Sequence, residues 1–258
     1  GLVGAVGFAT QRDEPTPCKG AGSAFATTWS PTREARIEAE FGALRAPHAG
    51  GTRRRVLSAL DSFAAAWVSE HEDACMDTAV RREQSSAMLD RRMTCLERMR
   101  TRFDGVARVF ETQAADALDR ADEVIADLPS PESCANLASL EHEAPPVDAA
   151  HRDALARVRA LVSQANALRV AGSKHTVPLA REAVSAAESL GISSALTEAE
   201  LALGRALDDA KDAESALVVL ERAHARAIRD DARTLARAIV GARHRAESGR
   251  GNTDAARA

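Results

Sequence analysis

The stretch LALGRALDDAKDAESALVVLERAHARAIR, residues 201–229, decides the fold. Its apolar residues recur at spacings of three and four on either side of a polar segment, Asp209 to Asp212, which predicts two helices joined by a turn. A related unit precedes it. Leu168 to Gly172 corresponds to Leu207 to Lys211, and Ala183 corresponds to Ala223, at offsets of 39 and 40 residues. A period in this range predicts stacked helical hairpins.

The composition of the whole chain also favours helices. Of its 258 residues, 45% are hydrophobic, but only 3% are aromatic and none is Tyr. Alanine dominates, and alanine is the best helix former. No alternating run of β-branched and aromatic residues predicts a strand. We therefore expect an all-α fold in which helical hairpins lead into an α-solenoid.

Proline, glycine and polar segments divide the chain. We expect residues 1–29 to hold the end of a membrane helix and a linker, because residues 1–8 are apolar and prolines follow. Ser30-Pro31 is a typical helix start. Long-helix hairpins are predicted over 30–128, a Pro-rich loop over 129–148, repeats over 149–247 and a disordered tail over 248–258. The loop is the expected domain boundary.

The second repeat resembles the tetratricopeptide pattern. Leu203-Gly204 and Leu207 are followed by Ala216, Leu220 and Ala223, which gives small residues where two helices would cross closely. Lys211 stands where that family usually has glycine, Ile228 stands where it has proline, and the period exceeds the usual length. The units are therefore tetratricopeptide-like.

The chain as a whole resembles the C-terminal region of myxobacterial membrane serine/threonine kinases, over roughly residues 1 to 230. The landmarks occur in order: Cys18-Lys-Gly-Ala21, Trp29, Trp67 eight residues before Cys75, Leu89-Asp90-Arg-Arg-Met93, Cys95-Leu96-Glu97-Arg98, Leu128-Pro129, Cys134, Ala144-Pro145-Pro146 and Ala187-Glu-Ser-Leu-Gly191. The resemblance implies a helical region outside the membrane, attached to a cytoplasmic kinase domain. That kinase domain is absent from this sequence, which has no Gly-rich loop, His-Arg-Asp or Asp-Phe-Gly motif.

No catalytic, metal or cofactor site is predicted. His71 and Cys75 are four residues apart on a predicted helix, but zinc needs further ligands and a nucleophile needs an orienting acid. Glu141-His142-Glu143 lies in the Pro-rich loop and is interpreted as solvated. Arg53-Arg54-Arg55 is interpreted as a solvated helix start, because no aromatic residues interleave with it. With a formal net charge of -4 and mixed signs, the chain is not expected to bind nucleic acid.

The four cysteines allow two disulfides in three pairings. A turn near Ser85 would place Cys75 and Cys95 level on a helical hairpin, so we predict a Cys75–Cys95 bond, which leaves Cys18 with Cys134. Four buried free thiols are the alternative. Trp67 is expected to pack against the Met88–Met99 face of the next helix, and Trp67 and Trp29 are each expected to anchor a core cluster.

We expect a binding groove on the first helices of the two repeats. In stacked hairpins these helices line the concave side, and the small residues Ala165 and Gly204 must face the second helix of their own hairpin. The positions that then project into the groove are Val162, Asn166, Arg169, Leu201, Arg205 and Asp208. Arg169 and Arg205 are candidates to form charge-assisted bonds with a carboxylate of an extended peptide. The alternative is that these positions are solvated helix faces.

The expected function is a non-catalytic sensory or scaffold module that binds a protein or ligand outside a bacterial membrane. One alternative is a cytoplasmic tetratricopeptide-type scaffold with reduced cysteines, and another is an enzyme whose site forms only in the folded chain. The identity of the partner and the oligomeric state do not follow from the sequence.

Overall fold

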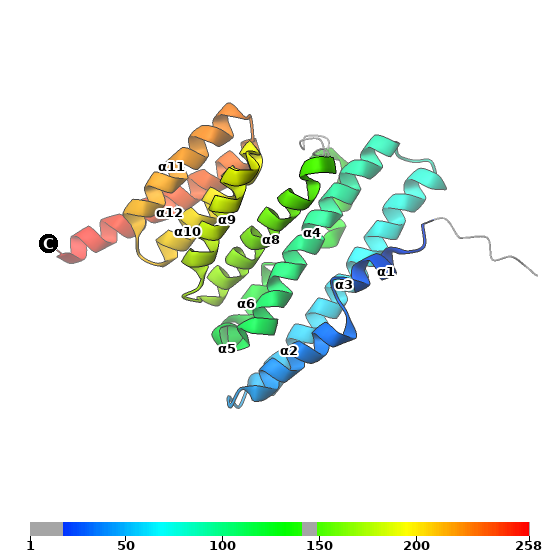
Figure 1. The fold of residues 1–258 in the computed structure, drawn as a ribbon, viewed down its shortest axis with the longest axis horizontal. Coiled ribbons are helices and arrows are strands. Elements are labelled where there is room, and N and C mark those ends of the chain that lie inside the picture. Colours follow the sequence, from blue (N-terminus) through cyan, green and yellow to red (C-terminus); the bar gives the residue numbers. More distant parts are fainter. Residues whose placement is uncertain (1–17, 141–148, 258) are drawn as a thin grey trace, which may run out of the picture.

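The computed structural model describes residues 18–140 and 149–257, and in these ranges it is all-α with no strand. Figure 1 shows the helices side by side in a row along the long axis, from α2 and α3 at one end to α11 and α12 at the other. The elements are α1 Ala21–Ala26, α2 Pro31–Ala43, α3 Ala49–Ala79, α4 Ser86–Thr112, α5 Ala114–Ala117, η1 Leu118–Arg120, α6 Ala121–Ala126, η2 Pro131–Ala135, α7 Leu137–Leu140, α8 Ala149–Ala171, α9 Thr176–Leu190, α10 Ser193–Asp209, α11 Ala213–Arg229 and α12 Arg233–Arg257.

Local sequence sets many helix ends. Ser30, Ser85 and Asp212 each accept a hydrogen bond from a backbone N–H of the first turn of their helix, which satisfies a donor that has no partner inside the helix. Pro31 follows Ser30 at the first helical position. Gly191 ends α9 in the left-handed region, with a φ of 73°, a conformation that glycine adopts without steric cost.

The hairpin of α3 and α4 carries the aromatic core. Trp67 is 3% exposed, and its Nε1 donates to the carbonyl oxygen of Leu96, 2.7 Å away. This confirms that Trp67 packs on α4. Trp29 is half-buried, lies edge-on against Phe103 and donates from its Nε1 to Asp61.

The predicted linker contains a helix. In α1, Phe25 is 2% exposed and its ring centroid lies 4.9 Å from that of Trp67. The prediction of a linker up to residue 29 was therefore wrong from Ala21 onward, because one large apolar side chain is enough to bind this short helix to the core. The predicted end of a membrane helix lies in residues 1–17, outside the described residues. No helix of the described part is long and apolar enough to span a bilayer.

Two disulfides are present, but the predicted pairing was wrong. Cys18 bonds Cys75, and Cys95 bonds Cys134, with Cα–Cα distances of 5.5 and 5.8 Å. Cys75 lies four residues before the end of α3, whereas Cys95 lies nine residues after the start of α4. At about 1.5 Å per residue the two are roughly 8 Å out of level, so each cysteine bonds a short segment packed beside its helix instead.

The Pro-rich segment does not separate two cores. Pro131 and Cys134 of η2 are buried, and η2 packs against both α3 and α4. On the other side, α8 packs along α4 and adds Ala167, Leu168 and Ala171 to the same hydrophobic cluster. Part of the expected loop, residues 129–140, thus belongs to the N-terminal region, and residues 141–148 lie outside the described part.

From α8 onward the helices stack as hairpins. α8 packs on α9 and α10, α10 packs on α11, and α12 packs on both α10 and α11. Gly204 faces α11 as predicted, because a Cβ added there would lie 2.5 Å from Cδ2 of Leu220. The expected disordered tail was wrong for the described residues: α12 continues to Arg257. Gly249 of α12 lies near Asp208 of α10, so this extension runs alongside the stack.

Candidate functional site

The first helices of the stacked hairpins, α8, α10 and α12, place three arginines near one another. The positive charges of Arg169 on α8 and Arg245 on α12 both act on Arg205 of α10. We call Asn166, Arg169, Arg205 and Arg245 the arginine face. The helices bring these residues together because α10 packs between α8 and α12.

Arg205 is the centre of this face. It is partly buried, and its Nε is shielded from solvent without a hydrogen-bond partner. Burial, together with the charges of Arg169 and Arg245, lowers the pKa of its guanidinium. Asp127 acts in the opposite direction but forms its ion pair with Arg102, at 3.5 Å. Arg205 has no ion pair within the described residues.

Two charged groups that are more deeply buried than Arg205 have partners. Arg92 pairs with Asp77 and Glu70 at the α3–α4 hairpin. Glu200, which is 2% exposed, pairs with Arg226 and Arg222. A buried charge is costly unless it is paired, so the lack of an ion pair sets Arg205 apart from these two groups. Arg53 of α3, which is also partly buried, likewise has a buried Nε without a partner and no ion pair within the described residues.

The neighbours of Arg205 are only partly satisfied. Arg169 pairs with Asp209 at 3.1 Å, but its Nε is buried without a partner. The Oδ1 of Asn166, one turn earlier on α8, is also buried without a partner. Burial and the adjacent Asp209 raise the pKa of Asp208, which lies near Arg245. Two buried donors, the Nε atoms of Arg169 and Arg205, and one buried acceptor, the Oδ1 of Asn166, thus have no partner on this face.

Leu201 does not line a groove, which corrects the prediction. It is 7% exposed and belongs to a cluster with Leu220 and Ile239, so α11 and α12 cover it. Val162 is only partly buried and packs against the core between α8 and α9. The prediction followed the helical period from Gly204 but did not consider that α12 would cover one side of α10.

Sequence reasoning also missed Arg245. It lies 40 residues after Arg205, at the repeat period already visible in the preceding hairpins. Treating α12 as the first helix of a third, incomplete repeat would have pointed to Arg245. The weak similarity of α12 to the earlier repeats concealed this signal.

Of the other sites considered in the sequence, the pair of His71 and Cys75 makes structural contacts. Cys75 is bonded to Cys18 and so has no thiol to act as a nucleophile. The ring of His71 lies tilted against that of Trp67, with ring centroids 5.0 Å apart, and burial lowers the pKa of His71. Among the described residues no group of three or more His, Cys, Asp or Glu side chains could hold a metal ion. Glu141-His142-Glu143 lies outside the described residues.

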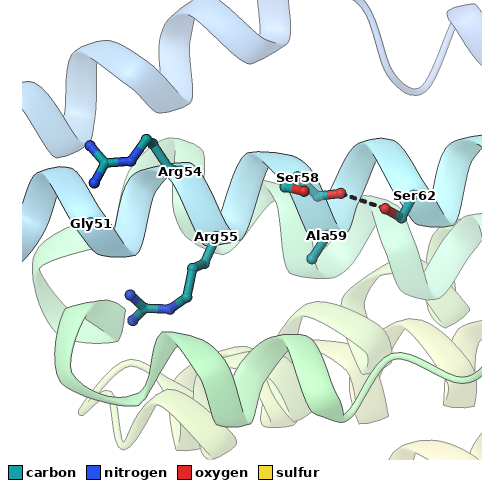
Figure 2. A pocket seen from close by; sticks show the side chains of 6 residues that line it. All are labelled: Gly51, Arg54, Arg55, Ser58, Ala59 and Ser62. Atoms are coloured by element: carbon teal, nitrogen blue, oxygen red, sulfur yellow. Dashed lines mark hydrogen bonds between the residues drawn. The ribbon is translucent and has the colours of Figure 1, made fainter.

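Arg54 and Arg55 of the basic run lie on an open face of α3, whereas Arg53 is partly buried. Figure 2 shows a pocket there, lined by Gly51, Arg54, Arg55, Ser58, Ala59 and Ser62, with the two arginines pointing away from each other. Arg55 is exposed and pairs with Asp122 of α6 at 2.9 Å. The two guanidinium groups thus diverge, and one of them is occupied, so this pocket does not gather charge as the arginine face does.

Comparisons with known proteins add no relative: no family model, no curated protein and no solved structure matches the chain.

Proposed function

We propose that the chain is a non-catalytic module that binds a protein or peptide ligand through the arginine face, and that the ligand presents a carboxylate to Arg205. The observation that carries this proposal is the guanidinium of Arg205, which is partly buried, lies beside Arg169 and Arg245, and has no ion pair within the described residues. A carboxylate accepts two parallel hydrogen bonds from a guanidinium, and such charge-assisted bonds are among the strongest in proteins.

The tetratricopeptide-like pattern supports a peptide as the ligand. Tandem hairpins present their first helices as one extended surface. The arginine face draws its members from the first helices α8, α10 and α12. An extended acidic segment laid across these helices would meet the arginines in succession.

We propose further that the module lies outside a bacterial membrane as part of a serine/threonine kinase that senses this ligand. Two disulfides support an oxidising compartment, since such bonds are rare in the cytosol. The ordered sequence landmarks, from Cys18 to Gly191, support the link with membrane kinases.

Selection from a library of random peptides with free C-termini tests the ligand class. The wild-type chain should enrich peptides rich in Asp and Glu. Arg205→Ala should weaken the binding of the enriched peptides about tenfold or more, because it removes charge-assisted bonds. Arg237→Ala, which removes an exposed arginine of α12, is the matched control and should leave binding unchanged. Equal binding by the two variants, or no enrichment of acidic peptides, would overturn the proposal.

A further inference from the structure

A second basic site lies where two turns of the stack meet. A pocket of about 810 Å³ opens between the α8–α9 turn and the C-terminal end of α10. This volume falls within the range of small-molecule sites. Arg169 is the one residue that the pocket shares with the arginine face. The lining residues used below are Arg120, Lys174, Arg181, Asp209, Lys211 and Asp212.

The pocket gathers positive charge in a chain whose formal net charge is -4. Five basic residues line it against two acidic ones. Asp209 pairs with Arg169, and Asp212 accepts a hydrogen bond from the backbone N–H of Ser215 at the start of α11. The lining therefore carries an excess of positive charge.

Three of these cations are exposed and form no ion pair in the described part of the chain, and the charge of Lys211 acts on Asp208. Arg120 is held by Glu123, but Lys174, Arg181 and Lys211 take part in no ion pair there. They come from three segments: the α8–α9 turn, the second turn of α9 and the α10–α11 turn. Three unpaired cations that converge on one pocket from separate segments form an arrangement suited to a ligand with several negative charges.

The turn after α10 and the start of α9 also line the pocket. Lys211 has a φ of 68°, as Gly172 at 76° and Asp231 at 49° have in the turns after α8 and α11, so this conformation is a shared helix end of the stack. Thr176 and Val177 lie at the N-terminus of α9, where no side chain caps the helix. The N–H of Thr176 donates to the carbonyl oxygen of Ser173 and Pro178 has no N–H, so the N–H of Val177 is the one in this turn that could meet an anion.

We propose that this pocket binds a compact small molecule that carries two or more phosphate groups. Its apolar lining consists of aliphatic side chains such as Val177, Ala206 and Leu207, without an aromatic ring. The recognised group is therefore the phosphate chain and not a nucleobase, which would need a stacking partner.

Titration calorimetry with inorganic tripolyphosphate tests the proposal. The wild-type chain should bind one equivalent saturably, with a dissociation constant below about 100 μM. Lys174→Ala/Arg181→Ala should weaken binding by tenfold or more, since each change removes a charged contact. Arg157→Ala/Arg237→Ala, which removes two exposed arginines outside the pocket, is the matched control and should bind as the wild type does. ATP should bind no more tightly than tripolyphosphate.

Lys211→Gly keeps the test valid if the double variant does not fold, because glycine suits the backbone at this turn. It should weaken tripolyphosphate binding severalfold. Binding that does not saturate, or that is unchanged in the two pocket variants, would overturn the proposal. ATP that binds tenfold more tightly than tripolyphosphate would contradict recognition through phosphate alone.

The result is independent of the proposed function. Arg205 and Arg245 do not line the pocket, so Arg205→Ala should leave tripolyphosphate binding intact. Conversely, Lys174→Ala/Arg181→Ala should leave acidic-peptide binding intact. Failure of one site is thereby distinguished from failure of the other.

Discussion

At the scale of single residues, Lys211 combines an unfavourable backbone with a charge placed at a pocket. Its φ of 68° is close to the 76° of Gly172 in the preceding hairpin. Lys211→Gly should therefore raise the free energy of unfolding by up to about 1 kcal/mol, because relief of the left-handed conformation exceeds the extra entropy that glycine brings to the unfolded chain. Gly172→Ala should lower it by about 1–2 kcal/mol. Urea denaturation measures both, and a destabilised Lys211→Gly variant would contradict the argument.

His71 should make stability depend on pH. Burial lowers its pKa below the ordinary value of 6.5, so the folded chain favours the neutral imidazole. Its contribution is present above pH 6.5 and is lost as the pH falls through the folded-state pKa, because the unfolded chain then binds more protons. The free energy of unfolding should fall more steeply between pH 7.5 and pH 5 (about the range in which histidine titrates) in the wild type than in His71→Gln. The exposed His175→Gln is the control and should follow the wild type; parallel curves for all three would exclude this role.

Some residue roles were predictable and others were not. The sequence period placed Gly204 against its partner helix correctly, since a small residue at a crossing is a local pattern. It placed Leu201 wrongly, because burial of Leu201 depends on α12, a helix from a more distant part of the chain. Arg205 was named as a groove residue, but its lack of an ion pair can only be seen when all neighbouring helices are in place.

At the scale of helices, close crossings depend on glycine. A Cβ added to Gly204 would lie 2.5 Å from both Cγ and Cδ2 of Leu220, so Gly204→Ala should lower the free energy of unfolding by about 1–3 kcal/mol through overpacking. Gly241 lies in α12 with nothing within 4 Å of an added Cβ, and Gly241→Ala should raise stability by about 0.5–1 kcal/mol. Thermal or urea unfolding should show stability changes of opposite sign for the two variants. This difference separates the effect of packing from that of helix propensity. Equal effects of the two changes would contradict the assigned crossing.

The disulfides fasten short segments to the α3–α4 hairpin. Cys18–Cys75 closes a loop with a sequence separation of 57 residues, and Cys95–Cys134 one of 39. Replacing either pair with alanine should lower the free energy of unfolding by about 2–5 kcal/mol. Peptide mapping of the unreduced protein checks the pairing directly. Recovery of a Cys75–Cys95 peptide would contradict it.

The helices were easier to predict than their connections. Caps such as Ser30 and Ser85 are local signals, and the long apolar periods of α3 and α4 are unambiguous. The disulfide pairing depends on where short segments pack, and no local pattern specifies this. For the same reason α1 was missed: its six residues are too few to show a period.

At the scale of the whole molecule, the row of helices produces two basic surfaces on a chain of negative formal charge. The Pro-rich segment was expected to divide the chain, but α8 packs along α4 and joins both parts through one core cluster. The hairpin stack therefore extends from a disulfide-bonded base. This arrangement holds α8, α10 and α12 in a fixed order, and that order sets the spacing of the arginine face.

The most direct test of the central claim is a double-mutant cycle between Arg205 and a bound carboxylate. Fluorescence anisotropy measures how tightly a selected acidic peptide binds to the wild type and to Arg205→Ala. The peptide is used with a free and with an amidated C-terminus. Each carboxylate of the peptide is also replaced in turn by its amide. If Arg205 binds a carboxylate, one replacement should show a coupling energy of about 1.5–3 kcal/mol with Arg205→Ala. Additive effects for every carboxylate would contradict the assignment of the arginine face as the binding site.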